Sequence, residues 1–117
     1  MSLHTNFKHH RNILIVELSG ELDHHTAESV RLEIDEAIMK ASVKHLIINA
    51  KKLEFMDSSG IGVILGRYKL MKHKQGKMLI CNMNETIAKL LELSGIFKII
   101  DTYGNESDAL SSLEVIS

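Results

Sequence analysis

Short apolar runs rich in β-branched residues alternate along this chain with longer stretches whose apolar residues recur every three or four positions. The short runs are typical of strands and lie at Asn12–Ser19, Lys44–Ala50 and Lys77–Asn82. The longer stretches predict helices and cover about residues 23–41, 57–76 and 84–94. Because strands joined by helices run parallel through right-handed crossovers, this order predicts an α/β fold with a mainly parallel sheet.

The two ends of the chain extend the pattern. Leu3–His10 predicts an edge strand, Phe97–Asp101 a short last strand, and Asn105 to about Val115 a closing helix. We therefore expect four to five strands, mostly parallel, with about four flanking helices. The 117 residues contain no proline and no Ser/Gly-rich linker, so we expect one domain that covers residues 1–117.

The charge balance and the cysteine and histidine content exclude several classes of function. Fourteen Lys and Arg against fifteen Asp and Glu give a net charge of -1, which argues against a nucleic-acid or membrane partner. The single cysteine, Cys81, forms no internal disulfide and suits the reducing cytoplasm. The adjacent pairs His9–His10 and His24–His25 lack the spacing of metal ligands, so we expect no metal and no cofactor.

Two polar loops are predicted to share one edge of the sheet. Residues 20–25 follow the first long strand and residues 55–60 follow the second, and the carboxyl ends of parallel strands meet at the same edge. Asp23 and Asp57 are therefore expected on one surface, with their polar groups toward solvent. Met56, beside Asp57, is a candidate for exposure at that surface.

The segment from Asp57 to Gly66 is the most unusual stretch of the chain. Asp57 stands where a helix N-cap belongs, so Ser58 becomes the first helical residue, with an exposed hydroxyl. Gly60, Gly62 and Gly66 each cost about 1 kcal/mol in a helix relative to Ala. Three such residues indicate a close approach, either by a neighbouring strand or by an external partner. A capped helix with small packing residues and a serine that accepts a phosphoryl group both fit this pattern.

A phosphoryl group on Ser58 would act as a charge switch. Phosphoserine carries close to two negative charges, which suit a helix N-terminus but oppose Asp57. A partner covering this point would bury an unpaired dianion, at a cost of several kcal/mol. A catalytic serine is the competing interpretation, but the chain has no G-x-S-x-G elbow, so we do not expect an enzyme.

Three segments carry a resemblance to a known family: Gly20–Glu28, Met56–Tyr68 and Ser94–Ile100. They resemble STAS-domain anti-sigma factor antagonists, and among these the ones that control sporulation in bacilli. The resemblance covers nearly the whole chain and is most specific in the two loops. The alternative is a STAS regulatory module of another circuit, in the general stress response or in ligand sensing.

The resemblance implies a partner switch. The unphosphorylated form of such a protein binds an anti-sigma factor that is also an ATP-dependent serine kinase, and so releases the sporulation sigma factor. The kinase phosphorylates the antagonist, which then dissociates, and a serine phosphatase reverses the modification. Carried over by motif, Ser58 is the phosphoacceptor and Asp57 holds its loop. The expected partner-binding residues are Asp23, His24, Asp57, Ser58, Ser59, Gly60 and Ile61.

Overall fold

The computed structural model describes residues 2–116 and alternates strands with helices. The elements are β1 (Leu3–His10), β2 (Ile13–Leu22), α1 (Ala27–Lys40), β3 (His45–Met56), α2 (Ser58–His73), β4 (Met78–Cys81), α3 (Glu85–Leu93), the 3-10 turn η1 (Ile96–Lys98), β5 (Asp101–Tyr103) and α4 (Glu106–Ile116). The helix and strand order confirms the α/β prediction. Within the described residues, no helix has the length and apolar character needed to cross a membrane.

The described strands form one sheet in the order β1-β2-β3-β4-β5. β1 pairs with β2 in antiparallel fashion, and the other neighbours run parallel. The hairpin between β1 and β2 turns at Arg11, which has a φ of 55°. The predicted edge strand at Leu3–His10 and the mainly parallel sheet are both confirmed.

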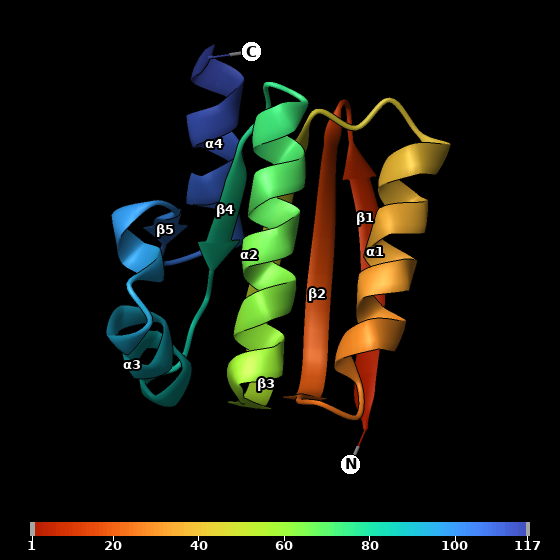
Figure 1. Ribbon diagram of the computed structural model, residues 1–117. Coiled ribbons are helices and arrows are strands. Elements are labelled where there is room, and N and C mark those ends of the chain that lie inside the picture. Colours follow the sequence, from red (N-terminus) through yellow and green to blue (C-terminus); the bar gives the residue numbers. More distant parts are fainter. Residues whose placement is uncertain (1, 117) are drawn as a thin grey trace.

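Alternate residues of the central strands β2, β3 and β4 belong to two separate hydrophobic clusters. Leu14, Val16 and Ile48 belong to the larger cluster, which α1, α2 and α3 cover. Ile15 and Ile47 belong to a smaller cluster closed by α4. Figure 1 shows α1 and α2 side by side in front of the sheet, with α4 behind β4. Because helices cover both faces of the sheet, these strands are apolar at consecutive positions and not only at every second one.

β3 is longer than the prediction, which ended it at Ala50. The structure extends it to Met56 because β2 also continues to Leu22 and keeps pairing with it across register shifts. Leu53 and Met56 face inward, with 1% of each residue exposed. The paired extension brings the β2 and β3 ends to the same level of the sheet edge.

The last strand and the start of the first helix differ from the prediction. The strand expected at Phe97–Asp101 is β5, at Asp101–Tyr103, and η1 occupies Ile96–Lys98. Gly95 ends α3 in a left-handed conformation (φ 81°), and a tight turn then buries both Ile96 and Ile100. α1 begins at Ala27 rather than near Asp23, because residues 23–26 form a hydrogen-bonded turn.

Candidate functional site

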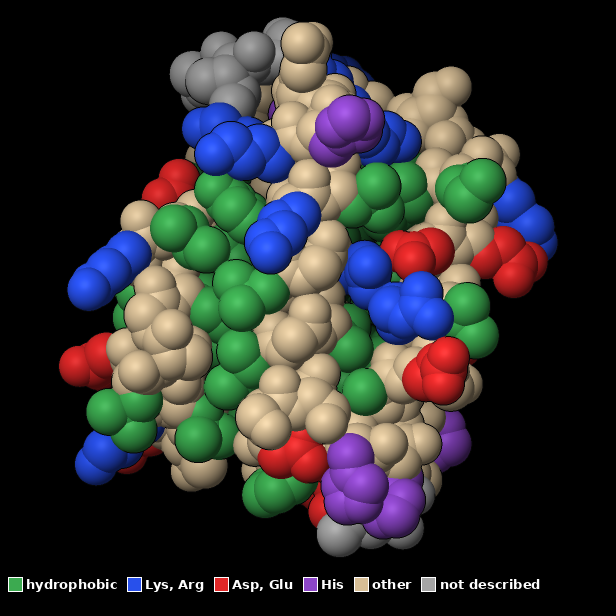
Figure 2. Space-filling view, viewed as in Figure 1, with side chains coloured by type: hydrophobic (Ala, Val, Ile, Leu, Met, Phe, Trp, Pro, Cys, Tyr) green, Lys and Arg blue, Asp and Glu red, His purple; other side chains and the backbone are tan. Residues whose placement is uncertain are grey.

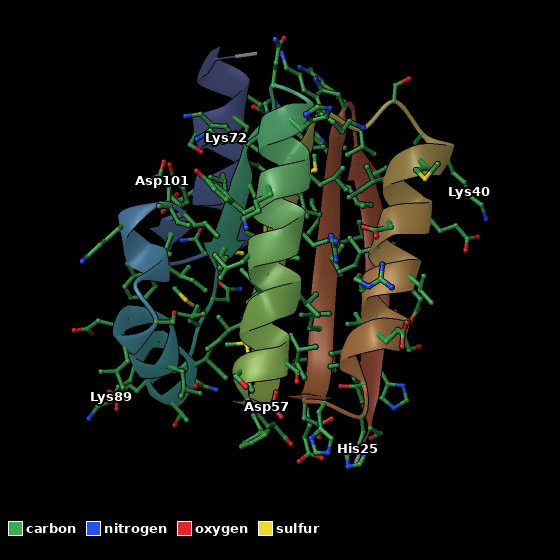
Figure 3. All side chains as sticks on the ribbon, in the orientation of Figure 1. His25, Lys40, Asp57, Lys72, Lys89 and Asp101 are labelled. Carbon is green, nitrogen blue, oxygen red and sulfur yellow. The ribbon has the colours of Figure 1, made fainter. Side chains whose placement is uncertain are left out.

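The loops after β2 and β3 lie side by side at one end of the sheet. Leu22 and Met56, the last residues of these strands, are register partners. The backbone N–H of Asp57 donates a hydrogen bond to the carbonyl oxygen of Leu22 at 3.3 Å. In Figure 3 the labelled Asp57 and His25 lie together at this end. The structure therefore brings together the two loops that the sequence placed at one edge.

Asp57 is the N-cap of α2. Its backbone is extended, and its Oδ1 oxygen accepts hydrogen bonds from the N–H groups of Ser59 at 2.9 Å and Gly60 at 3.3 Å. Its carbonyl oxygen accepts from the N–H of Ile61 at 3.1 Å. An aspartate side chain suits this position because it satisfies amides that the first helical turn leaves without partners. The cap fixes where α2 begins and therefore where Ser58 stands.

The second oxygen of Asp57 reaches the neighbouring loop. Oδ2 accepts a hydrogen bond from the backbone N–H of His24 at 3.1 Å, and the Nδ1 of His24 lies 3.5 Å from it. Burial acts to raise the pKa of Asp57, but backbone hydrogen bonds from Gly60, His24 and Ser59 outweigh it and hold the pKa below the ordinary value. Asp57 is therefore a charged link between the two loops.

Ser58 is the first residue of α2 and is exposed. Its hydroxyl has no hydrogen-bond partner among the described residues. Three of the first amides of α2, those of Ser59, Gly60 and Ile61, already donate to Asp57. A group attached to the Ser58 hydroxyl would consequently face solvent, with few free amides to bind it.

Asp23 differs from the expectation that its carboxylate faces solvent. The residue is only 2% exposed, and its Oδ1 accepts from the N–H groups of His25 at 2.9 Å and Thr26 at 3.2 Å. The Oγ1 of Thr26 accepts from the Asp23 N–H at 3.0 Å and donates to the Glu21 carbonyl at 2.8 Å. Burial acts to raise the pKa of Asp23, but the hydrogen bonds from the His25 and Thr26 amides, together with the charge of His25 and the hydroxyl of Thr26, outweigh it and hold the pKa below the ordinary value. Asp23 therefore organises its loop from within.

The histidines of this loop point outward. His24 and His25 are both exposed, and their ring centroids lie 3.9 Å apart at a tilt of 39°. Ser59 and Ile61 are partly exposed on the first turn of α2. Of the expected partner-binding residues, His24, Asp57, Ser58, Ser59 and Ile61 thus present surface, whereas Asp23 and Gly60 are buried.

The three α2 glycines separate into two kinds. A Cβ on Gly60 would lie 2.7 Å from the Leu22 carbonyl oxygen and 2.5 Å from the Met56 side chain. A Cβ on Gly62 or Gly66 would meet nothing within 4 Å. The expected close approach by a strand is therefore real at Gly60, while Gly62 and Gly66 border open space.

The exposed apolar residue at this edge is not Met56. Met56 is 1% exposed, whereas the preceding Phe55 is 43% exposed. Gly20 pairs with Leu53 and Glu21 with Phe55, so this register shift leaves Glu54 as an extra residue in β3. The extra residue resets the alternation of side chains across the strand, so Leu53 and Met56 face the core while Phe55 faces outward. A prediction that ended the strand at Ala50 could not identify Phe55. Within residues 2–116, no cluster of His, Cys, Asp and Glu side chains is arranged to hold a metal ion.

The STAS domain family model matches residues 4–109 of the chain. The match covers most of the sequence, and the chain belongs to the STAS domain family.

Individual proteins are also similar to this chain. The anti-sigma F factor antagonist of Paenibacillus polymyxa is 53% identical over 117 residues, covering 100% of both chains. The anti-sigma-B factor antagonist of Bacillus subtilis is 29% identical over 86% of this chain and 91% of its own. The solved structure of the Bacillus cell fate determinant SpoIIAA in its phosphorylated form has a TM-score of 0.74 at 32% identity, covering 93% of this chain and 98% of that chain.

Proposed function

We propose that this chain antagonises an anti-sigma factor and that phosphorylation of Ser58 switches the interaction off. The observation that carries the proposal is the exposed, unpartnered Ser58 hydroxyl beside the Asp57 link between the two loops. The full-length relative of Paenibacillus polymyxa, an anti-sigma F factor antagonist, supports a sporulation sigma factor as the one released. The solved relative in a phosphorylated form supports control by phosphorylation.

The unmodified surface suits a protein partner. Phe55 supplies exposed apolar area at the end of β3, and Ser58, Ser59 and His24 present small or polar groups at the same edge of the sheet. The partner would be an anti-sigma factor serine kinase that presents ATP to this edge. The γ-phosphorus then forms a bond to the Ser58 oxygen, its bond to the ADP oxygen breaks, and the hydroxyl proton leaves to solvent or to a kinase base.

The phosphate changes binding through charge. It would stand beside the Asp57 carboxylate, whose lowered pKa keeps it ionised, so about three negative charges would gather at one point. The nearby α2 amides already donate to Asp57, which leaves the phosphate directed at the partner. Burying it unpaired costs several kcal/mol, and each 1.4 kcal/mol is tenfold in affinity. A serine phosphatase restores the binding form.

The proposal also covers the expected lack of enzyme activity, the domain organisation and the cellular location of this chain. We expect the chain to act by binding a partner and not by catalysis, as the anti-sigma factor antagonist name of its full-length relative suggests. We treat residues 1–117 as one domain that acts in the cytoplasm, where sigma factors and ATP are present.

Another circuit is the second candidate, favoured by the likeness to the anti-sigma-B factor antagonist of Bacillus subtilis. Pull-down of the tagged chain from sporulating cells distinguishes the two by which anti-sigma factor is recovered. The direct test of the modification is incubation with the recovered kinase and ATP, followed by peptide mass mapping. We expect one phosphate, on Ser58, and none on a Ser58→Ala variant, with Ser59→Ala as the matched control that is still modified. Phosphate on Ser59, or none at all, would contradict the proposal.

A further inference from the structure

A hollow of about 220 Å³ lies between the last turns of α2 and the segment that follows η1. Tyr68 and Ile99 supply apolar walls, and the first residues of β4 also line it. Ile99 is 46% exposed, and Phe97, two positions earlier, is 39% exposed. Figure 2 shows hydrophobic side chains gathered between α2 and the α3–η1 segment, bordered mainly by Lys and Arg side chains. Exposed apolar area with a polar border is typical of a protein-binding surface.

The border of this hollow carries an excess of positive charge. Of the described residues that line it, Lys72 and Lys77 are basic and Asp101 is acidic. Neither lysine forms an ion pair within the described part of the chain, and the ammonium of Lys72 lies 6.0 Å from the centre of the Tyr68 ring. Residues 58–84 contain no Asp or Glu, so α2 itself offers these lysines no acidic partner. A cation in the last turn suits the helix dipole, but Lys77 lies beyond the helix. The unpaired cations favour an acidic partner over a basic one.

The hollow lies on the side of α2 that begins at Ser58. Ser58, Leu65 and Lys72 recur every seven residues, close to two helical turns, so they share one face of the helix. Leu65 and Tyr68 are both partly exposed. A stable protein interface takes about 20–30 residues from each side, many more than the edge around Ser58 presents. A partner seated on Ser58 would therefore cover further surface, and this face of α2 extends to the hollow.

We propose that the surface around Tyr68 and Ile99 is a second contact for the anti-sigma factor, which places there an apolar side chain flanked by acidic residues. The inference rests on the proposed function and names the chemistry of the partner segment. The apolar side chain fills the hollow, and its acidic neighbours meet Lys72 and Lys77. A second copy of this chain is a poorer fit, because it would bring the same lysines against each other. Charges at the border of an interface act mainly on the association rate and its salt dependence.

Reversing one charge tests the acidic partner. Lys72→Glu should weaken binding of the anti-sigma factor kinase at least about fivefold at low ionic strength, mainly through slower association, and the loss should shrink at high ionic strength. Surface plasmon resonance measures both rates. Lys74→Glu is the matched control, because Lys74 is also exposed at the C-terminal end of α2 but does not line the hollow. Its Kd should stay within about twofold of the parent. Equal losses in the two variants would overturn the proposal.

Two further variants separate the apolar and the acidic parts of the contact. Ile99→Ala should weaken binding at least about threefold, whereas Leu32→Ala, a comparably exposed residue on α1, should leave Kd unchanged. Asp101→Asn removes a negative charge from the border and should tighten binding about twofold. Weaker or unchanged binding of Asp101→Asn would overturn the acidic occupant. Unchanged Kd in both Lys72→Glu and Ile99→Ala would overturn the contact while leaving the Ser58 switch intact.

The parent chain supplies two further tests. Failure of the parent chain to bind the kinase would overturn both this inference and the proposed function. Sedimentation velocity of the parent chain alone should show a species that Ile99→Ala leaves unchanged. A dimer that Ile99→Ala dissociates would assign the surface to a second copy and overturn the acidic partner.

Discussion

The Oδ2 oxygen of Asp57 accepts a hydrogen bond from the backbone N–H of His24 at 3.1 Å, across 33 positions of sequence. The other oxygen of the same carboxylate caps α2 through Ser59 and Gly60. One side chain therefore sets both the start of the helix and its distance from the neighbouring loop. The surface around Ser58 depends on these two contacts together.

Replacing Asp57 should separate the two roles. Asparagine is as good an N-cap as aspartate, so Asp57→Asn should keep the cap while losing the second acceptor for His24. Asp57→Ala loses both and should lower Tm by about 4 °C or more. Differential scanning calorimetry measures the stability, and amide chemical shifts of residues 23–26 report the loop. If Asp57→Asn leaves the His24 amide shift unchanged, the link does not hold the loops together.

The buried carboxylate of Asp23 predicts an indirect role in binding. Asp23→Asn keeps an oxygen that can accept from the His25 and Thr26 amides, as asparagine does in such turns. Its affinity for the anti-sigma factor should stay within about threefold of the parent. Asp23→Ala leaves both amides without an acceptor and should weaken binding at least about tenfold. Equal losses in the two variants would indicate that the charge of Asp23 acts on the partner directly.

Gly60 and Gly66 should respond oppositely to alanine. At Gly60 the new methyl group would lie against the Leu22 carbonyl and the Met56 side chain, so Gly60→Ala should lower the free energy of unfolding by about 1–3 kcal/mol. At Gly66 it would enter open space, and Gly66→Ala should raise the free energy of unfolding by up to about 1 kcal/mol. Urea titration measures both. Destabilisation by Gly66→Ala would contradict the open space found beside this residue.

His45 should make stability depend on pH. Burial lowers its pKa below the ordinary 6.5, and the charges of Lys44 and Lys77 lower it further. Its Nδ1 accepts from the Lys77 N–H at 3.0 Å, which requires the neutral ring. Protonation is easier in the unfolded chain, so this contribution to stability is complete above pH 6.5 and is lost as pH falls toward the lower folded pKa.

A matched variant isolates this contribution. In His45→Gln the amide oxygen can still accept from the Lys77 N–H, but nothing titrates at this position. The free energy of unfolding, measured from pH 7.5 to 5, should fall more steeply in the parent chain than in the variant. Parallel curves would exclude His45 as the source.

Local chemistry was sufficient to predict much of this structure. The apolar periodicity predicted the α/β order, and an aspartate before a periodic stretch predicted the α2 cap at Asp57. These features are decided within one helical turn or one strand. The β3 extension to Met56 was not predictable in the same way, because it depends on the pairing of β2 across its register shifts.

The candidate site likewise combines features that local sequence decides with features that long-range packing decides. The position of Ser58 follows from the cap, but the burial of Asp23 depends on how residues 23–26 fold back on their own amides. Likewise, three glycines in one helix have the same local preference, and only the packing of Leu22 against α2 distinguishes Gly60 from Gly62 and Gly66. Contacts between residues far apart in the sequence decide such differences.

The affinity of the anti-sigma factor kinase for this chain, with and without a phosphoryl group on Ser58, tests the central claim most directly. The affinity is measured by isothermal titration calorimetry in the presence of a nonhydrolysable ATP analogue, which prevents phosphoryl transfer during the measurement. We expect the phosphorylated chain to bind at least about 100-fold more weakly, with its Tm close to that of the unmodified chain. Equal affinity of the two forms would contradict the account.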